Sequence, residues 1–93
     1  MTKETLLHVL AAEGLKVASD VVTIHDERDA TFLVAGPGET IQVSKVTKVE
    51  LRESALCVES TKGERFWFTY DLLLGVRLTT ARTAKEHAAG FSR

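Results

Sequence analysis

Apolar residues near the start of the chain recur at helical spacing. Leu6 and Leu10 lie about one turn apart, Thr2 precedes them as a residue suited to cap a helix, and Gly14 follows them as a stop. The spacing predicts a helix over about residues 3–13 with one apolar face.

After this helix the pattern changes to short runs of β-branched and aromatic residues. Residues 21–24 and 30–35 are two such runs, and the charged stretch 25–29 separates them. This arrangement predicts a β-hairpin. The proline between two glycines at 36–38 then predicts a tight reversal, because proline cannot donate a hydrogen bond within a sheet.

The segment from residue 41 changes the parity of its apolar positions. Ile41 and Val43 share one parity with Val49, whereas Val46 has the other, so one straight strand cannot place all four on one face. A bend or bulge near residues 44–48 reconciles them. Bent strands of this kind turn the corners of small barrels, which favours a barrel or roll over a flat sheet.

The next two reversals can be placed by asking which loop length pairs apolar residues with apolar residues. A two-residue loop would oppose Val58 to Trp67 and mix the faces, whereas a three-residue loop over 61–63 separates them and puts Gly63 where hairpins favour a left-handed backbone. The same test fixes the reversal at 53–54. The predicted pairs are Val58–Phe66, Leu56–Phe68, Cys57–Trp67 and Glu59–Arg65, and then Leu51–Leu56, Val49–Val58, Glu50–Cys57 and Lys48–Glu59.

These pairs predict a three-stranded meander with one apolar face and one mixed face. Trp67 lies on the mixed face, next to Arg65 and away from the predicted core. The apolar face carries Val49, Leu51, Leu56, Val58, Phe66 and Phe68, and the mixed face carries the rows Lys48–Glu59–Arg65 and Glu50–Cys57–Trp67.

The rest of the chain is expected to close the barrel. Tyr70 is predicted to enter the core, and residues 71–74 to form one helical turn that Asp71 caps and whose leucines fill the barrel end. A strand through Val76 and Leu78 then completes the barrel. A last helix is expected at about residues 81–89, with a thin stripe of alanines that predicts a loosely docked tail.

The predicted architecture is therefore α+β and mainly β: a small antiparallel β-barrel or roll with an N-terminal helix and a short C-terminal helix. Residues 1–93 form one domain in this interpretation, with the barrel over about 20–79 and a helical tail over about 80–93. The stretch 41–78 resembles the half-barrels of SH3-like and pleckstrin-homology-like domains. The resemblance is one of architecture, covers under half of the chain and implies no activity.

Composition narrows the class of protein. The chain has 44% apolar and 27% charged residues, which is typical of a folded globular protein, and its net charge of −1 creates no global field for nucleic acid or an acidic membrane. It has one cysteine, and we find no secretion signal and no apolar run long enough to span a membrane. We therefore expect a cytoplasmic protein that is not bound to a membrane.

Catalytic and metal-binding patterns are not found in the sequence. The histidines at 8, 25 and 87 are far apart, without the short spacing of metal ligands. Cys57 is expected beside Glu50 and Trp67, neither of which would activate a thiol. We expect no enzyme, no cofactor and no metal.

The mixed face of the meander is the best candidate for a functional surface. Trp67 needs cover, which could come from the first helix, from the C-terminal tail or from a partner. We predict a non-catalytic protein-interaction module that self-associates as a homodimer or binds another protein. The alternative is a nucleic-acid-binding barrel that uses the same face, which Glu50 and Glu59 argue against. The candidate interface residues are Trp67, Arg65, Lys48, Arg82, Lys85 and Phe91.

Overall fold

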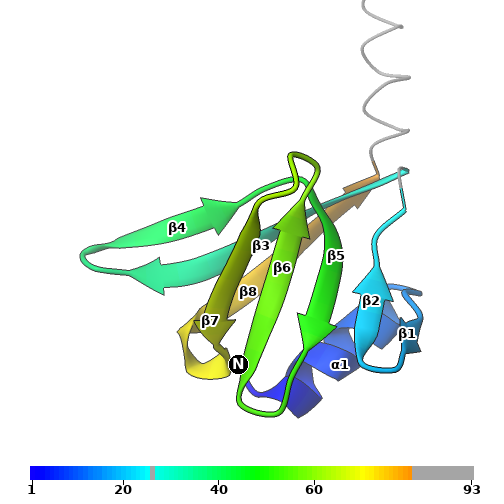
Figure 1. The fold of residues 1–93 in the computed structure, drawn as a ribbon, viewed down its shortest axis with the longest axis horizontal. Coiled ribbons are helices and arrows are strands. Elements are labelled where there is room, and N and C mark those ends of the chain that lie inside the picture. The colour runs from blue at the N-terminus through cyan, green and yellow to red at the C-terminus, as the bar shows by residue number, and fades with distance from the viewer. Residues whose placement is uncertain (26, 81–93) are drawn as a thin grey trace, which may run out of the picture.

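The computed structural model describes residues 1–25 and 27–80, which form two antiparallel sheets and one helix (Figure 1). Sheet A has the strand order β1-β2-β5-β6-β7, and sheet B has the order β4-β3-β8. The elements are α1 (Lys3–Ala12), β1 (Val17–Ala18), β2 (Val21–Thr23), β3 (Arg28–Gly36), β4 (Glu39–Val43), β5 (Val46–Leu51), β6 (Ala55–Ser60), β7 (Arg65–Thr69), the 3-10 turn η1 (Tyr70–Leu72) and β8 (Leu73–Thr80).

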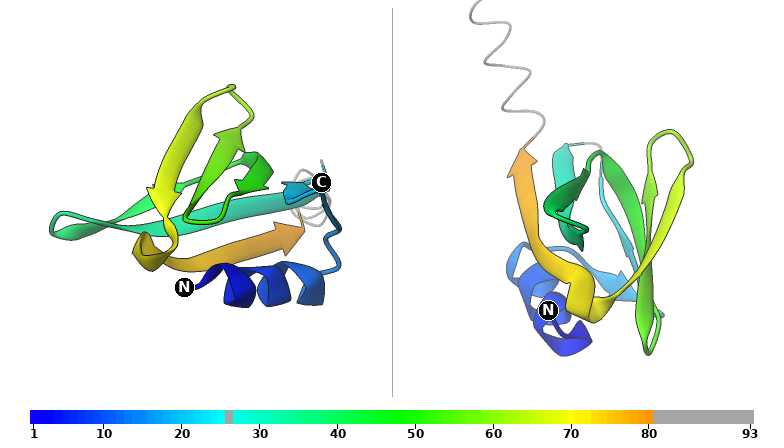
Figure 2. Two further views of the ribbon diagram at one scale, coloured as in Figure 1. Left: turned by 60° about the horizontal axis from the view of Figure 1, so that its bottom comes forward. Right: turned by 90° about the vertical axis from the view of Figure 1, so that its left-hand side faces the viewer.

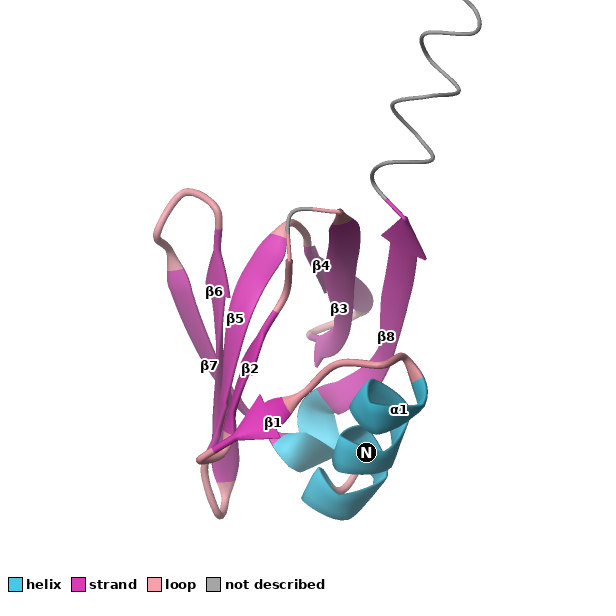
Figure 3. Cartoon of the chain, turned by 90° about the vertical axis from the view of Figure 1, so that its right-hand side faces the viewer, coloured by secondary structure: helices cyan, strands magenta, loops and turns pink. Residues whose placement is uncertain are grey.

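The prediction of a barrel or roll is wrong, because the described strands form two separate sheets that do not close on each other. β7 ends sheet A and β4 ends sheet B, and these two edges are not hydrogen-bonded to each other. Figure 3 shows the sheets as two layers, with α1 at one end beside β8. The chain is mainly β, as expected, but it is not an SH3-like or pleckstrin-homology-like barrel.

The predicted hairpin between residues 21–24 and 30–35 is also wrong. β2 pairs with β1 and β5 in sheet A, whereas β3 pairs with β4 and β8 in sheet B. The stretch between them takes the chain from one sheet to the other. The nine-residue β3 is the central strand of its sheet, and Ala30 and Phe32 on its inner face are completely buried.

The prediction for the N-terminal helix is confirmed. The Thr2 hydroxyl accepts a hydrogen bond from the Thr5 N–H at 3.1 Å, and Gly14 follows the helix with φ +79°. Leu6 and Leu10 are completely buried. The Met1 amino group donates to the carbonyls of Tyr70 in η1 and Leu73 at the start of β8, so the start of α1 is held against this corner.

The predicted register of the meander is confirmed at all eight pairs. β5, β6 and β7 pair in the register that places apolar residues on one face and charged residues on the other. The predicted bend near 44–48 is confirmed as well: Lys45 has φ +55°, and the β5–β6 register shifts between Val46 and Lys48. The bend is larger than expected: it divides this segment into two strands, β4 and β5, that belong to different sheets.

The core lies between the two sheets and under α1. Each large aliphatic or aromatic side chain removed from water here contributes about 1.5–3 kcal/mol before the entropic cost of folding. The largest completely buried side chains of the core include Phe32, Leu6, Leu10, Leu51, Leu56, Leu73, Val22, Val49 and Val58.

Two core predictions at the end of the meander need correction. Phe66 is 37% exposed, because nothing in sheet B covers the inner face of the last strand of sheet A at that point. Leu72 and Leu74 are also exposed, because the turn η1 is only three residues long and β8 already begins at Leu73, which is buried. Tyr70 is buried as predicted.

The expected C-terminal helix and the remainder of the tail after Thr80 lie outside the described residues. Of the described helices, none is long and apolar enough to cross a membrane.

Candidate interaction edge

The edge strand β7 is held firmly at both ends. At its start, Gly63 has φ +81° and donates its N–H to the Ser60 carbonyl at 2.9 Å, which closes the β6–β7 turn. At its end, the buried Tyr70 hydroxyl donates to the Arg52 carbonyl in the β5–β6 loop at 2.5 Å. Along its length, β7 is paired with β6 on one side. No strand in the part of the chain that the structure describes pairs with its other side, which we call the free edge of β7.

Trp67 lies at the middle of β7 and is 54% exposed. Its side chain is on the outer face of sheet A, because its position alternates with Phe66 and Phe68 on the inner face. α1 lies on the opposite side of sheet A, so it does not cover the indole (Figure 3). One of the three expected sources of cover is therefore excluded.

Arg65 packs beside this indole and is also paired with acidic residues. Its guanidinium carbon is 5.9 Å from the centre of the Trp67 ring, within the range of a cation–π contact. Its Nη2 donates to Glu50 Oε2 at 3.2 Å, and its Nη1 lies 4.0 Å from Glu59 Oε1. The neighbouring Cys57 thiol, with Glu50 and Glu59, raises the pKa of Arg65. The guanidinium therefore remains charged and is held over the face that Trp67 occupies.

Glu50 is the centre of the charges on this face. Its side chain is 15% exposed, and its carboxylate lies 3.8 Å from Lys48 Nζ and 3.6 Å from Arg52 Nη2 in addition to the contact with Arg65. The three cations are largely exposed, so each pair stabilises the fold by less than about 1 kcal/mol. Glu50 and Glu59 offset part of the positive charge of these cations around the indole.

Cys57 is only 2% exposed, although it lies on the outer face of sheet A. Its cross-strand neighbours are Glu50 and Trp67, as predicted. The nearby Arg65 guanidinium was missed by the sequence reasoning, because Arg65 is a diagonal neighbour rather than a direct partner. Side chains of the outer face itself therefore cover the thiol.

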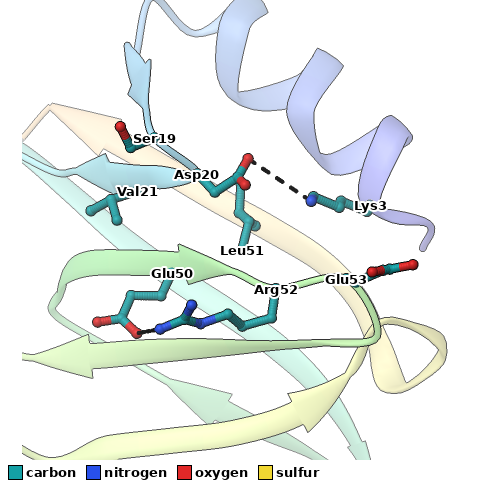
Figure 4. Close-up of a pocket in the computed structure, with 8 residues that line it drawn as sticks. All are labelled: Lys3, Ser19, Asp20, Val21, Glu50, Leu51, Arg52 and Glu53. Atoms are coloured by element: carbon teal, nitrogen blue, oxygen red, sulfur yellow. Dashed lines mark ion pairs between the residues drawn. The ribbon is translucent and has the colours of Figure 1, made fainter.

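A polar hollow of about 560 Å³ opens where α1, the β1–β2 turn and the end of β5 meet (Figure 4). The turn residues Ser19 and Asp20 both have positive φ, and Asp20 is 3.9 Å from Lys3 across the hollow. The guanidinium of Arg52, on the opposite wall, lies 3.6 Å from Glu50 Oε2. Two ion pairs, Lys3–Asp20 and Arg52–Glu50, thus join four of the charged groups that line the hollow. Sequence reasoning did not find this hollow.

Metal-binding geometry is not present in the part of the chain that the structure describes. No group of three or more His, Cys, Asp or Glu side chains in residues 1–25 and 27–80 is placed to hold an ion. Comparison of the chain with models of known families, with curated proteins and with solved structures finds no match.

The structure brings together three of the six predicted interface residues. Trp67, Arg65 and Lys48 lie on the outer face of sheet A, around Glu50. Arg82, Lys85 and Phe91 lie outside the described residues. The sequence reasoning missed a second free strand, β4, because it assigned residues 41–51 to one bent strand of a barrel.

Proposed function

We propose that the chain is a non-catalytic protein-interaction module whose contact surface is the free edge of β7, with Trp67 as the anchor. One observation carries the proposal: a strand at the edge of a sheet presents a half-exposed tryptophan on one face and a partly exposed phenylalanine, Phe66, on the other. Free edges pair with strands from other chains, and tryptophan and arginine are the residues that most often anchor interfaces.

The rigidity of this edge supports the proposal. Hydrogen bonds at Gly63 and Tyr70 fix the two ends of β7, and Arg65 fixes the indole from one side. A surface that is already ordered loses little conformational entropy when it binds.

The test is affinity capture from the native host followed by measurement of the dissociation constant with the purified partner. Trp67→Ala is expected to weaken binding at least tenfold, as expected for an anchor worth more than about 1.4 kcal/mol. Thr23→Ala, on the outer face of β2, is the matched control and should bind as the wild type does. Equal affinities of the Trp67→Ala variant and the wild type for every captured partner would contradict the proposal.

The nucleic-acid alternative has less support, because Glu50 and Glu59 pair with the cations beside Trp67. Single-stranded binding needs a positive groove along the aromatic side chains. Titration of single-stranded oligonucleotides at low salt, followed by the emission of the single tryptophan, should leave the emission unchanged. Strong quenching that weakens with added salt would favour this alternative instead.

A further inference from the structure

Two of the four edge strands of the described sheets, β7 of sheet A and β4 of sheet B, open on the same side of the molecule. The hairpin of β3 and β4 extends past β7 on that side (Figures 1 and 2). We call its outer part, residues 34–41, the arm. Ile41 of the arm is 44% exposed, although its pairing with the buried Val34 places it on the inner face of sheet B. In residues 1–25 and 27–80, no strand of sheet A lies opposite the arm.

The free hydrogen-bonding groups of β7 can be assigned from its turn. Ser60 donates its N–H to the Glu64 carbonyl at 2.9 Å, so this carbonyl points towards β6 at the start of the β6–β7 ladder. Bonded and non-bonded pairs alternate in an antiparallel ladder. The backbone groups of Arg65, Trp67 and Thr69 therefore point away from β6, towards the free edge.

The free groups of β4 follow from the same alternation. A two-residue loop, Pro37-Gly38, joins Gly36 to its partner Glu39, and such a loop is closed by a hydrogen-bonded pair. The backbone groups of Thr40 and Gln42 therefore point away from β3. On both strands, the residues whose backbone groups point to the free edge have their side chains on the outer face. A hydrogen-bonded pairing of β7 with β4 therefore also places inner-face side chains opposite inner-face side chains.

Two registers between β7 and a β4 from a second copy satisfy this rule and pair four residues of each strand. One places Phe68 opposite Glu39, which sets an apolar ring against a carboxylate on the inner face. The other register places the inner-face phenylalanines of β7 opposite apolar inner-face residues of β4. Its pairs are Phe66 with Val43, Phe68 with Ile41, Trp67 with Gln42 and Thr69 with Thr40.

We propose that two copies of the chain exchange arms, so that β4 of each copy pairs antiparallel with β7 of the other in this second register. The exchange places a strand of sheet A opposite each arm, gives Ile41 and Phe66 apolar cross-strand neighbours, and sets Gln42 beside Trp67 in both copies. The same two edges are used twice about a two-fold axis, which makes the interface self-complementary. This inference rests on the proposed function, and it names a second copy as the occupant of the β7 edge.

The register can be tested by disulfide cross-linking in a background that carries Cys57→Ala. Thr40 and Thr69 form a hydrogen-bonded pair in the proposed register, with Cα atoms about 5.5 Å apart, which suits a disulfide. We expect a mixture of Thr40→Cys and Thr69→Cys chains to form cross-linked heterodimers under mild oxidation, and neither variant alone to do so. The matched control, Thr40→Cys mixed with Thr23→Cys, should give no such product, because β2 lies far from the β7 edge.

Light scattering on the full chain gives the second test. The wild type at high micromolar concentration is expected to have twice the mass of one chain, and Ile41→Asp is expected to halve that mass. Because Ile41 is exposed, the variant should keep the circular dichroism spectrum of the wild type.

The outcomes separate this inference from the proposed function. A monomeric wild type that still binds another protein through Trp67 would overturn the arm exchange and leave the proposed function standing. A dimer that survives Ile41→Asp, or that gives no Thr40–Thr69 cross-link, would also overturn it. A monomeric wild type with no Trp67-dependent partner would contradict both.

Discussion

β6 and β7 are neighbouring strands with the same alternation of apolar and polar residues, yet they have different surroundings. The inner residues of β6, Leu56 and Val58, are completely buried, whereas Phe66 of β7 is 37% exposed. Both strands follow the register that the sequence predicts. The difference shows that cross-strand pairing follows from local pattern, whereas burial depends on whether another layer of the molecule lies opposite.

The largest difference between the two strands should appear on truncation of an inner side chain. Leu56→Ala is expected to lower the free energy of unfolding by about 2–5 kcal/mol, because it leaves a cavity in the core. Phe66→Ala should cost only about 1 kcal/mol, since the ring already contacts water. Urea unfolding of dilute protein measures both. Equal losses for the two variants would mean that β7 is as well covered as β6.

The next largest effect on stability is expected at Tyr70, whose hydrogen bond to the Arg52 carbonyl holds the end of β7. Tyr70→Phe is expected to cost about 1 kcal/mol, because the Arg52 carbonyl loses its donor. Burial, with a smaller effect from Asp20, raises the pKa of Tyr70. The unfolded chain therefore releases this proton first, and stability that is present below a pH of about 10 is lost as the pH rises through the folded pKa.

This pH dependence can be measured by urea unfolding at several alkaline pH values. The difference in stability between the wild type and Tyr70→Phe should shrink as the pH rises. A difference that stays constant or grows would show that the phenol is not held in its neutral form.

The turn that starts β7 should give an effect of about 1 kcal/mol. Gly63 has φ +81° and open space around the position of a Cβ, so Gly63→Ala is destabilising through backbone conformation alone. Gly63→Asn should cost less, because asparagine tolerates this conformation. Gly75→Ala is the matched control: a Cβ there meets only Leu33, at 3.9 Å. Thermal unfolding ranks the variants, and an effect of Gly75→Ala equal to that of Gly63→Ala would refute the assignment.

The smallest effect on stability is expected at the most exposed ring of β7. Trp67→Ala should change the free energy of unfolding of dilute protein by at most about 0.5 kcal/mol. It should nevertheless increase the reaction rate of the Cys57 thiol with a thiol reagent, because the indole is one of the side chains beside it. Leu74→Ala, at an equally exposed apolar position in β8, should not change that rate. An unchanged thiol reaction in Trp67→Ala would show that other groups cover Cys57.

The sequence was sufficient to predict features that depend on neighbours along the chain. The cap at Thr2, the bend at Lys45 and the turn at Gly63 are all confirmed, and so are the eight cross-strand pairs. Each of these depends on residues that are close in sequence, where parity and backbone preference decide the outcome.

The arrangement of the sheets could not be predicted in this way. β2 pairs with β5 and β3 pairs with β8, across segments whose length and pattern permit other partners. Parity says which face of a strand is apolar, but it does not say which sheet will cover that face. For this reason the prediction of Trp67 on the outer face is confirmed, whereas the prediction of Phe66 in the core is wrong and the sequence does not predict the free edge of β4.

The division of the chain between two sheets also has a consequence for the order of folding. The β5–β6–β7 meander joins strands through loops of only a few residues, so it can form early with little loss of chain entropy. β2 and β8 each find their partners across much longer loops, and the contacts of the Met1 amino group span about seventy residues. We expect the meander to be structured in the folding transition state and the N-terminal segment to dock last.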